Sequence, residues 1–255
     1  MKNYATLLFL LATVLPAHAQ VPATAPATTP DFDRPVSWKL MVPNLASDQK
    51  RIWTSPAQLR KRKYLIPTLA ILGATAALVA LDSRTAPTFR ETTDFNGFNK
   101  VFSGNNTAYG TIAVPAVMYA TSFAIRDTKL RNTALLAAEA VGGSEILTYV
   151  LKEATNRTRP SAIPTGGNYS DTWFENKYTL NDKGGFPSGH TIAAFSVATV
   201  VARRYRNRKW VPYVAYGLAG VVGFSRVSLS AHFVSDVFAG AALGYSISRF
   251  AVLQQ

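Results

Sequence analysis

The chain has 255 residues, of which 48% are hydrophobic, and it carries 27 basic and 14 acidic side chains for a formal net charge of +13. This length and composition suffice for one domain with a sizeable core, and the lack of cysteine in the sequence excludes disulfides, thiolate nucleophiles and cysteine metal sites. The positive charge favours anionic partners such as lipid head groups or phosphorylated substrates over nucleic acid, because no nucleic-acid-binding motif accompanies it.

The first residues have the three zones of a secretory signal peptide. Lys2 supplies a positive charge, residues 5–15 form an apolar run, and the small-residue triplet at 17–19 resembles a cleavage site. We therefore expect a signal peptide over residues 1–19 that is removed on export, with a buried first helix as the alternative.

Residues 20–36 are rich in Pro, Ala and Thr and show no helical or strand period, which predicts a flexible tether. A helical domain is expected over residues 37–255. Its first part, residues 37–63, mixes large apolar side chains with basic ones, so it either lies along a membrane surface or wraps the core as a polar collar.

Six apolar segments follow, each long enough for a buried helix and rich in Ala and Gly, which favours close helix packing over strands. The segments are residues 64–81, 109–125, 133–151, 188–202, 210–224 and 235–250. We expect an all-α fold, a six-helix up-and-down bundle in which each segment reverses the direction of the one before it.

In such a bundle, three polar motifs fall at the same end. Lys152 and Arg159-Pro160 follow the third helix, residues 187–190 (Pro-Ser-Gly-His) open the fourth, and residues 225–236 join the fifth to the sixth. The connections at the opposite end are basic: residues 60–63, 126–131 and 203–209. The sequence therefore predicts an active site at one end of the bundle.

Phosphoryl transfer needs cations around the phosphate oxygens, an in-line nucleophile and a proton for the leaving group. The cations would come from Lys152, Arg159 and Arg226, and a helix that begins near Ser188 would add backbone N–H groups, a hydroxyl and close backbone approach at Gly189. Together these residues predict a phosphate-binding site.

His232 and Asp236 are four residues apart, so on a helix they share a face. The carboxylate would then hold one ring nitrogen while the other attacks phosphorus, which makes His232 the expected nucleophile. No carboxylates and histidines cluster at metal-ligand spacing in the sequence, so we expect no metal and no cofactor.

In order and internal spacing, the three motifs resemble the signature of the type 2 phosphatidic acid phosphatase superfamily. The resemblance covers about the last 110 residues closely. It implies a phosphohistidine intermediate, with His190 donating a proton to the departing alcohol and later helping to activate water. Vanadium haloperoxidases are similar in the same motifs and bind vanadate where phosphate would sit.

Other polar residues have structural interpretations. Arg157 is expected to be solvated or lipid-facing, Glu139 and Glu145 to pair with cations of the bundle, and Ser225 to position Arg226. The long connection at residues 161–186 is rich in aromatic residues and either contacts an acyl or isoprenoid chain or plugs the end of the bundle.

Two lines of reasoning disagree about the membrane. Basic connections at one end and motifs at the other follow the positive-inside rule, whereas an export signal would place residues 60–63 on the wrong side for that topology.

We expect an exported protein, periplasmic or associated with an anionic membrane, whose active site faces the periplasm. It would be a phosphatase acting on a lipid phosphate, a polyprenyl diphosphate or a small phosphomonoester. The alternatives are a vanadate-dependent haloperoxidase and a non-catalytic envelope protein, and the sequence does not determine the oligomeric state.

Overall fold

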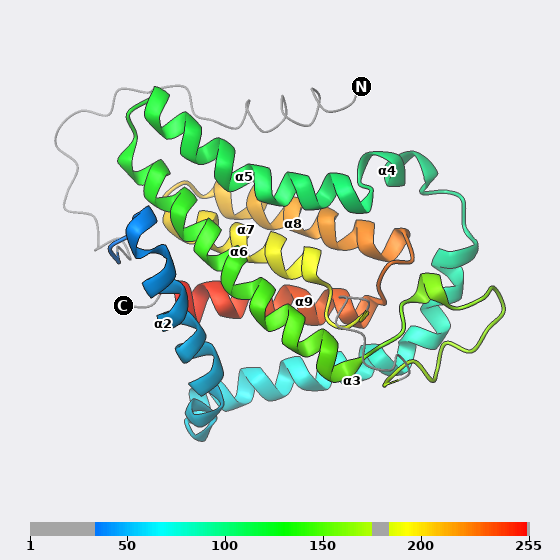
Figure 1. The fold of residues 1–255 in the computed structure, drawn as a ribbon. Helices are drawn as coiled ribbons and strands as arrows, with labels where there is room; N and C mark the ends of the chain where they lie inside the picture. The colour runs from blue at the N-terminus through cyan, green and yellow to red at the C-terminus, as the bar shows by residue number, and fades with distance from the viewer. Residues whose placement is uncertain (1–33, 175–183, 254–255) are drawn as a thin grey trace. The chain divides into compact units, whose positions relative to one another are not determined.

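The chain is all-α in a computed structural model that describes residues 34–174 and 184–253. The predicted signal peptide and most of the tether lie outside these residues. Each of the six predicted apolar segments overlaps one long helix, which confirms the fold class (Figure 1). These helices are α3 (Arg62–Glu91), α5 (Gly104–Ala124), α6 (Thr128–Thr155), α7 (Gly189–Arg204), α8 (Trp210–Ser228) and α9 (Val234–Ile247).

The prediction of six helices was too low for the part of the chain that is described. The additional elements are η1 (Trp38–Leu40), α2 (Met41–Thr54), η2 (Ser55–Arg60), the short α4 (Asn96–Val101), η3 (Pro160–Ala162) and the π-helical turn η4 (Ser248–Val252). The prediction followed apolar runs, and the apolar residues of α2 are interspersed with as many polar ones. Its position depends on side chains that reach backbone carbonyls: Gln49 donates to Gly143 at 3.0 Å and Arg51 to Ala251 at 3.0 Å. Residues 41–54 therefore pack against α6 and η4.

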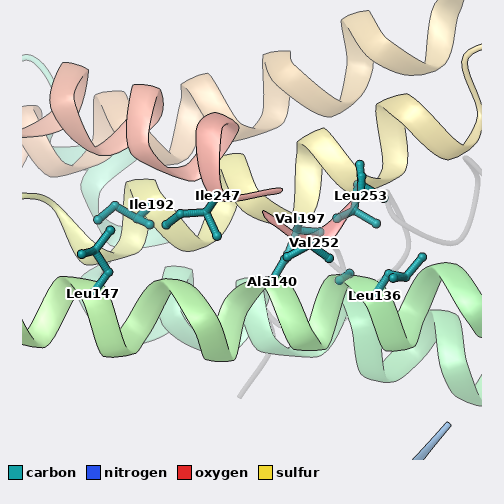
Figure 2. Packing of buried hydrophobic residues seen from close by; sticks show 10 residues of the cluster. Leu136, Ala140, Leu147, Ile192, Val197, Ile247, Val252 and Leu253 are labelled. Atoms are coloured by element: carbon teal, nitrogen blue, oxygen red, sulfur yellow. The ribbon is translucent and has the colours of Figure 1, made fainter. Parts of the chain in front are cut away.

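Helix α7 occupies the centre of the bundle and packs extensively against α6, α8 and α9 (Figure 1). Leu147 of α6, Ile192 of α7 and Ile247 of α9 face one another and belong to a single buried cluster (Figure 2). Since the residues at both ends of α7 are anchored by this packing, its first turn is held in a fixed position relative to the neighbouring helices.

Glycines bring α9 unusually close to α7, as the small-residue content of the sequence predicted. A Cβ at Gly240 would lie 2.9 Å from the carbonyl oxygen of Ser188, and one at Gly244 would lie 2.3 Å from that of Ile192. Both distances are shorter than a van der Waals contact, so only glycine permits this spacing. The close contact sets the N-terminal ends of α7 and α9 next to each other.

Local capping explains where several helices begin and end. Asp127 accepts a hydrogen bond from the backbone of Leu130 at 2.9 Å at the start of α6, and Ser103 accepts one from Asn106 at 3.3 Å at the start of α5. Helix α6 ends where Asn156 adopts a left-handed conformation with φ 41°. The helix therefore ends within one turn of Lys152.

Helix α3 continues ten residues beyond the predicted end at residue 81. The apolar pattern stops at Asp82, but this carboxylate is buried and bonded to Arg157 and Ser235, so the helix remains inside the fold. By length and composition, α3 and α6 could each cross a membrane. The apolar window of α3 is entirely unburied, whereas 56% of the window of α6 is buried within the protein.

Glu139 in α6 pairs with a cation, as predicted, but the cation comes from outside the bundle. Arg34, inside the segment predicted as tether, forms ion pairs with Glu139 and with Asp48 of α2, the latter at 2.6 Å. Asn44 of α2 also donates to Glu139, at 2.8 Å. These contacts attach α2 to α6. Glu145 lies on the exposed side of α6.

Candidate active site

The first motif lies at the C-terminal end of α6 and just beyond it. Lys152 is in the last helical turn and is buried, with 6% of its surface exposed, and Arg159 follows the left-handed residue that ends the helix. The ammonium nitrogen of Lys152 lies 3.8 Å from the position that a Cβ on Gly189 would occupy. The fold therefore brings the first motif against the second.

The second motif begins α7, and the two glycines that precede it pack against the segment of the first motif. A Cβ on Gly184 would be 2.8 Å from the carbonyl oxygen of Lys152, and a Cβ on Gly185 would be 3.0 Å from that of Arg157. The Gly185 N–H also donates to the Arg157 carbonyl at 2.6 Å. The peptide bond between Phe186 and Pro187 is cis.

Ser188 and His190, in the first turn of α7, face different partners. The Ser188 N–H donates to the carbonyl of Asp236 at 3.1 Å, and its hydroxyl hydrogen-bonds the hydroxyl of Thr191 at 2.8 Å. His190 Nε2 lies 3.1 Å from the carbonyl oxygen of Gly104, which can only accept a hydrogen bond. A role for the Ser188 hydroxyl in holding phosphate stays a prediction.

Arg226, from the third motif, lies in the last turn of α8 and is almost fully buried. Ser225 positions its guanidinium by accepting two hydrogen bonds, at 3.1 and 2.9 Å, as the sequence suggested. The guanidinium also donates to the carbonyl of Phe102 at 2.6 Å. Together with the His190 contact to Gly104, this bond places the backbone between α4 and α5 directly over the site.

His232 lies in the connection before α9 rather than on the helix, so it does not share a helical face with Asp236. Its Nδ1 is 2.6 Å from the carbonyl oxygen of Gly185 and 3.5 Å from Asp236 Oδ2. A carbonyl only accepts, so Nδ1 carries the proton and Nε2 is left with a free lone pair. The carboxylate of Asp236 is held by the Phe233 N–H at 2.8 Å and by Arg157 at 2.5 Å.

Clustered cations and burial govern the electrostatics of the site. Burial, followed by the charge of Arg226 and smaller contributions from His232 and Lys152, lowers the pKa of His190 to about 4, and the hydrogen bond to Gly104 opposes this shift. Burial and the neighbouring Arg159 lower the pKa of Arg226 to about 10. Burial also lowers the pKa of His232, and Asp236 opposes that shift. An anion would relieve this excess of positive charge.

Sequence reasoning missed Arg157, which was expected to be solvated or lipid-facing. The structure instead buries it at 1% exposure, bonded to Asp82 at 2.7 Å and to Asp236. Arginine is rarely buried unless it is paired, and its partner on α3 lies 75 residues away in the chain. No local pattern could reveal that pairing.

The connection at residues 161–186 is described as far as residue 174 and again from residue 184. Trp173 packs against Phe186 with ring centroids 5.2 Å apart and against the Arg157 guanidinium, and Tyr169 is buried. These two rings therefore pack against the protein at this end of the bundle, and contact of the connection with an acyl or isoprenoid chain stays a prediction. Phe174 is 74% exposed, and Tyr178 lies outside the described residues.

An apolar pocket opens beside His232, between α3 and the start of α9. Its lining includes Ala86 and Phe89 of α3 together with Phe233 and Val234. No group of three or more His, Asp or Glu side chains at metal-binding distance occurs within residues 34–174 and 184–253. This arrangement can bind an anion between the cations Lys152, Arg159 and Arg226. Nε2 of His232 is then available to react with that anion.

Residues 133–255 match the PAP2 superfamily. The chain is 34% identical over 118 residues to phosphatidylglycerophosphatase B of Bacillus subtilis, covering 43% of this chain and 52% of that protein. It is 42% identical over 65 residues to a lipid A 1-phosphatase of Porphyromonas gingivalis, covering 25% of this chain and 15% of that protein, and 36% identical over 104 residues to one of Rhizobium etli, covering 40% and 41%.

The chain thus spans about half the length, or less, of these curated relatives. Among solved structures, it is similar to a transmembrane PAP2 type phosphatidylglycerolphosphate phosphatase from Bacillus subtilis, with 22% identity, a TM-score of 0.46, and coverage of 84% of this chain and 92% of that one.

Proposed function

We propose that this protein, whose residues 133–255 match the PAP2 superfamily, is a metal-independent phosphatase that hydrolyses a phosphate ester through a phosphohistidine intermediate on His232. One observation carries the proposal: His190, which is partly exposed, interacts electrostatically with buried Lys152 and Arg226 and with His232, whose Nε2 is free. Such a cluster is stabilised by a phosphate, and a free imidazole nitrogen inside it is a nucleophile.

Residues of this chain account for each step of the proposed hydrolysis. Nε2 of His232 attacks phosphorus, the bond from phosphorus to the ester oxygen breaks, and His190 gives the leaving alcohol its proton. Water next attacks the phosphohistidine, His190 takes its proton, and phosphate leaves with His232 restored. Lys152, Arg159 and Arg226 neutralise the charge on the phosphoryl oxygens throughout.

His190 would change its protonation state when substrate binds. Its pKa of about 4 makes the ring neutral in the empty site at pH 7. A bound phosphate dianion offsets the charges of Arg226 and Lys152, and this raises the pKa of the ring. Substrate binding therefore favours protonation of His190, the general acid.

The proposed substrate is a lipid phosphate or polyprenyl diphosphate rather than a small phosphomonoester. Helix α3 exposes large apolar side chains, including Leu65, Leu69 and Leu72, that a hydrocarbon chain can contact. The curated relatives named above are phosphatidylglycerophosphatase B and lipid A phosphatases. We further propose that the protein associates with a membrane through the unburied apolar surface of α3, with its active site on the periplasmic side.

The test is a screen for phosphate release from lipid, isoprenoid and soluble substrates, with and without detergent. We expect release from one of the first two classes, unaffected by EDTA, and loss of at least about 10³-fold in His232→Ala. Vanadate should inhibit the enzyme, because it occupies the phosphate site. Activation of halide oxidation by vanadate would instead identify a haloperoxidase, and wild-type turnover by His232→Ala would refute the mechanism.

A further inference from the structure

Arg157 joins two carboxylates in the interior, one of which contacts the proposed nucleophile. Its guanidinium donates to Asp82 Oδ2 at 2.7 Å and to Asp236 Oδ1 at 2.5 Å. Ser235 closes the group, since its hydroxyl donates to Asp82 and accepts from Arg157 at 2.8 Å. All four side chains are almost fully buried.

The group is also fixed from the sides. Thr172 accepts from the Arg157 Nε at 3.2 Å, and the guanidinium carbon lies 4.1 Å from the ring centroid of Phe233 and 4.3 Å from that of Trp173. A planar guanidinium with this many partners has one orientation. The Asp236 carboxylate that it holds is therefore fixed relative to His232.

The charges of the group do not cancel. If Asp236 were paired with Arg157 alone, the two charges would largely offset each other and leave little negative potential at His232. Asp82 takes the other side of the guanidinium, so the three side chains together carry one net negative charge. Transfer of a phosphoryl group to Nε2 makes the His232 ring cationic, and that cation is stabilised by a nearby negative charge.

From this geometry we propose that Asp82 and Arg157 are positioning residues for His232, acting through Asp236: Arg157 fixes the carboxylate in place, and Asp82 preserves the negative charge that the phosphorylated ring requires. The inference rests on the proposed function, and it extends the site to α3, which none of the three motifs includes. Neither residue touches the phosphate, so neither should contribute to its binding.

The decisive variant is Asp82→Asn, and the chain offers a matched control. Asp48 is another buried aspartate that is paired with an arginine, Arg34, but it lies on α2 in the group that attaches α2 to α6. Both variants remove a buried negative charge beside an arginine, so both should lower stability. Only Asp82→Asn should alter the chemistry.

For Asp82→Asn we expect kcat per folded molecule to fall about 10- to 100-fold, the range seen when groups that orient metal-bound histidines are removed. KM should change little, because Lys152, Arg159 and Arg226 are untouched. The acid limb of the kcat/KM profile should move to lower pH, because His232 loses negative potential while Lys152, Arg159, Arg226 and His190 still face it.

A second readout does not require turnover. The sequence contains three histidines, so the His232 ring can be followed by NMR titration, with His190→Gln to assign the signals. Its pKa should fall in Asp82→Asn and stay unchanged in Asp48→Asn. In the double variant Asp82→Asn/Arg157→Gln, which restores one net negative charge and leaves no arginine without its second carboxylate, the pKa should return toward the wild-type value.

The outcomes separate the two proposals. Equal kcat and equal His232 titration in Asp82→Asn and Asp48→Asn would overturn this inference, as would a double variant that titrates like Asp82→Asn. Absence of phosphate release by the wild type, or full activity of His232→Ala, would overturn the proposed function and leave the titration result standing. If Asp82→Asn does not fold, kcat of the double variant decides the matter: that variant lacks the guanidinium that fixes Asp236, so a kcat equal to that of the wild type would overturn the positioning role.

Discussion

Both histidines of the site have one ring nitrogen beside a backbone carbonyl, and this contact assigns their tautomers. Nδ1 of His232 donates to Gly185, and Nε2 of His190 donates to Gly104. The two rings therefore present different nitrogens to a substrate. His232 offers Nε2 as a nucleophile, whereas the Nε2–H of His190 is bonded to the Gly104 carbonyl, so Nδ1 is the nitrogen of His190 that is left to exchange a proton with a substrate.

The lowered pKa of His190 predicts a loss of stability in acid. An unfolded histidine binds a proton below pH 6.5, whereas the folded ring resists protonation down to about pH 4. Between these values the unfolded state binds more protons, so stability falls as the pH falls. His190→Gln should keep roughly 2 to 4 kcal/mol more of its neutral-pH stability at pH 4.

The measurement is the free energy of unfolding at pH 7 and pH 4 for both proteins in the same mild detergent. His190→Gln removes the titrating ring, so its difference between the two pH values should be smaller. If both proteins lose equal stability between pH 7 and pH 4, His190 is not a buried neutral ring.

The sequence predicted the motif residues because their chemistry is local. Lys152, Arg226 and His232 each stand in a short polar stretch beside an apolar helix, and the bundle topology brings these stretches to one end. Arg157 and Asp82 escaped prediction because their partners are far apart in the chain and an isolated arginine is usually solvated. Gly185 escaped because a backbone carbonyl has no signature in the sequence.

Helices α7 and α9 position the site through their close contact. The Ser188 N–H at the start of α7 bonds the Asp236 carbonyl in the first turn of α9, and Gly240 and Gly244 let the two backbones approach. Any increase in their separation would therefore move Asp236 away from Ser188 and the start of α7. Under the proposed function, the packing of this pair of helices would then affect catalysis.

Gly244→Ala tests that coupling. Its Cβ would lie 2.3 Å from the Ile192 carbonyl oxygen, so α9 must shift. We expect a loss of about 1 to 3 kcal/mol in unfolding free energy together with a fall in kcat. Gly217→Ala in α8 is the control, since nothing lies within 4 Å of its Cβ, and alanine there should stabilise the helix by about 0.5 to 1 kcal/mol with kcat unchanged.

Denaturation and initial-rate measurements on the two variants are sufficient. Unchanged stability and activity in Gly244→Ala would show that the spacing of α7 and α9 is not critical. The sequence supported this contact only in general terms: its Ala and Gly content predicted close packing, but which glycine faces which carbonyl depends on helix rotation, and that is set by the whole core.

Across the molecule, charge is distributed by position along the bundle. The connections before α3, between α5 and α6, and between α7 and α8 contain residues 60–63, 126–131 and 203–209, which are basic, and the motifs occupy the opposite ends of the same helices. Large apolar side chains on α3, including Leu65, Leu69 and Leu72, are exposed. A membrane that is anionic at its surface suits both features.

Vesicle binding follows from this distribution. Co-sedimentation with vesicles containing anionic lipid should exceed that with neutral vesicles and should weaken with salt, because exposed charges are screened beyond about 10 Å at 0.1 M ionic strength. Replacing Leu69 with Lys in α3 should reduce binding to both kinds of vesicle. Equal binding to both vesicle types at low salt would show that the basic end does not meet the membrane.

The identity of the phosphorylated atom tests the account most directly. Rapid quenching of the enzyme with a substrate labelled in its phosphate, followed by peptide mapping, should find an acid-labile phosphoryl group on His232, absent from His232→Ala and longer-lived when His190 is replaced by Gln. Turnover with the label on another residue, or with no covalent label under conditions where phosphate release is complete, would contradict it.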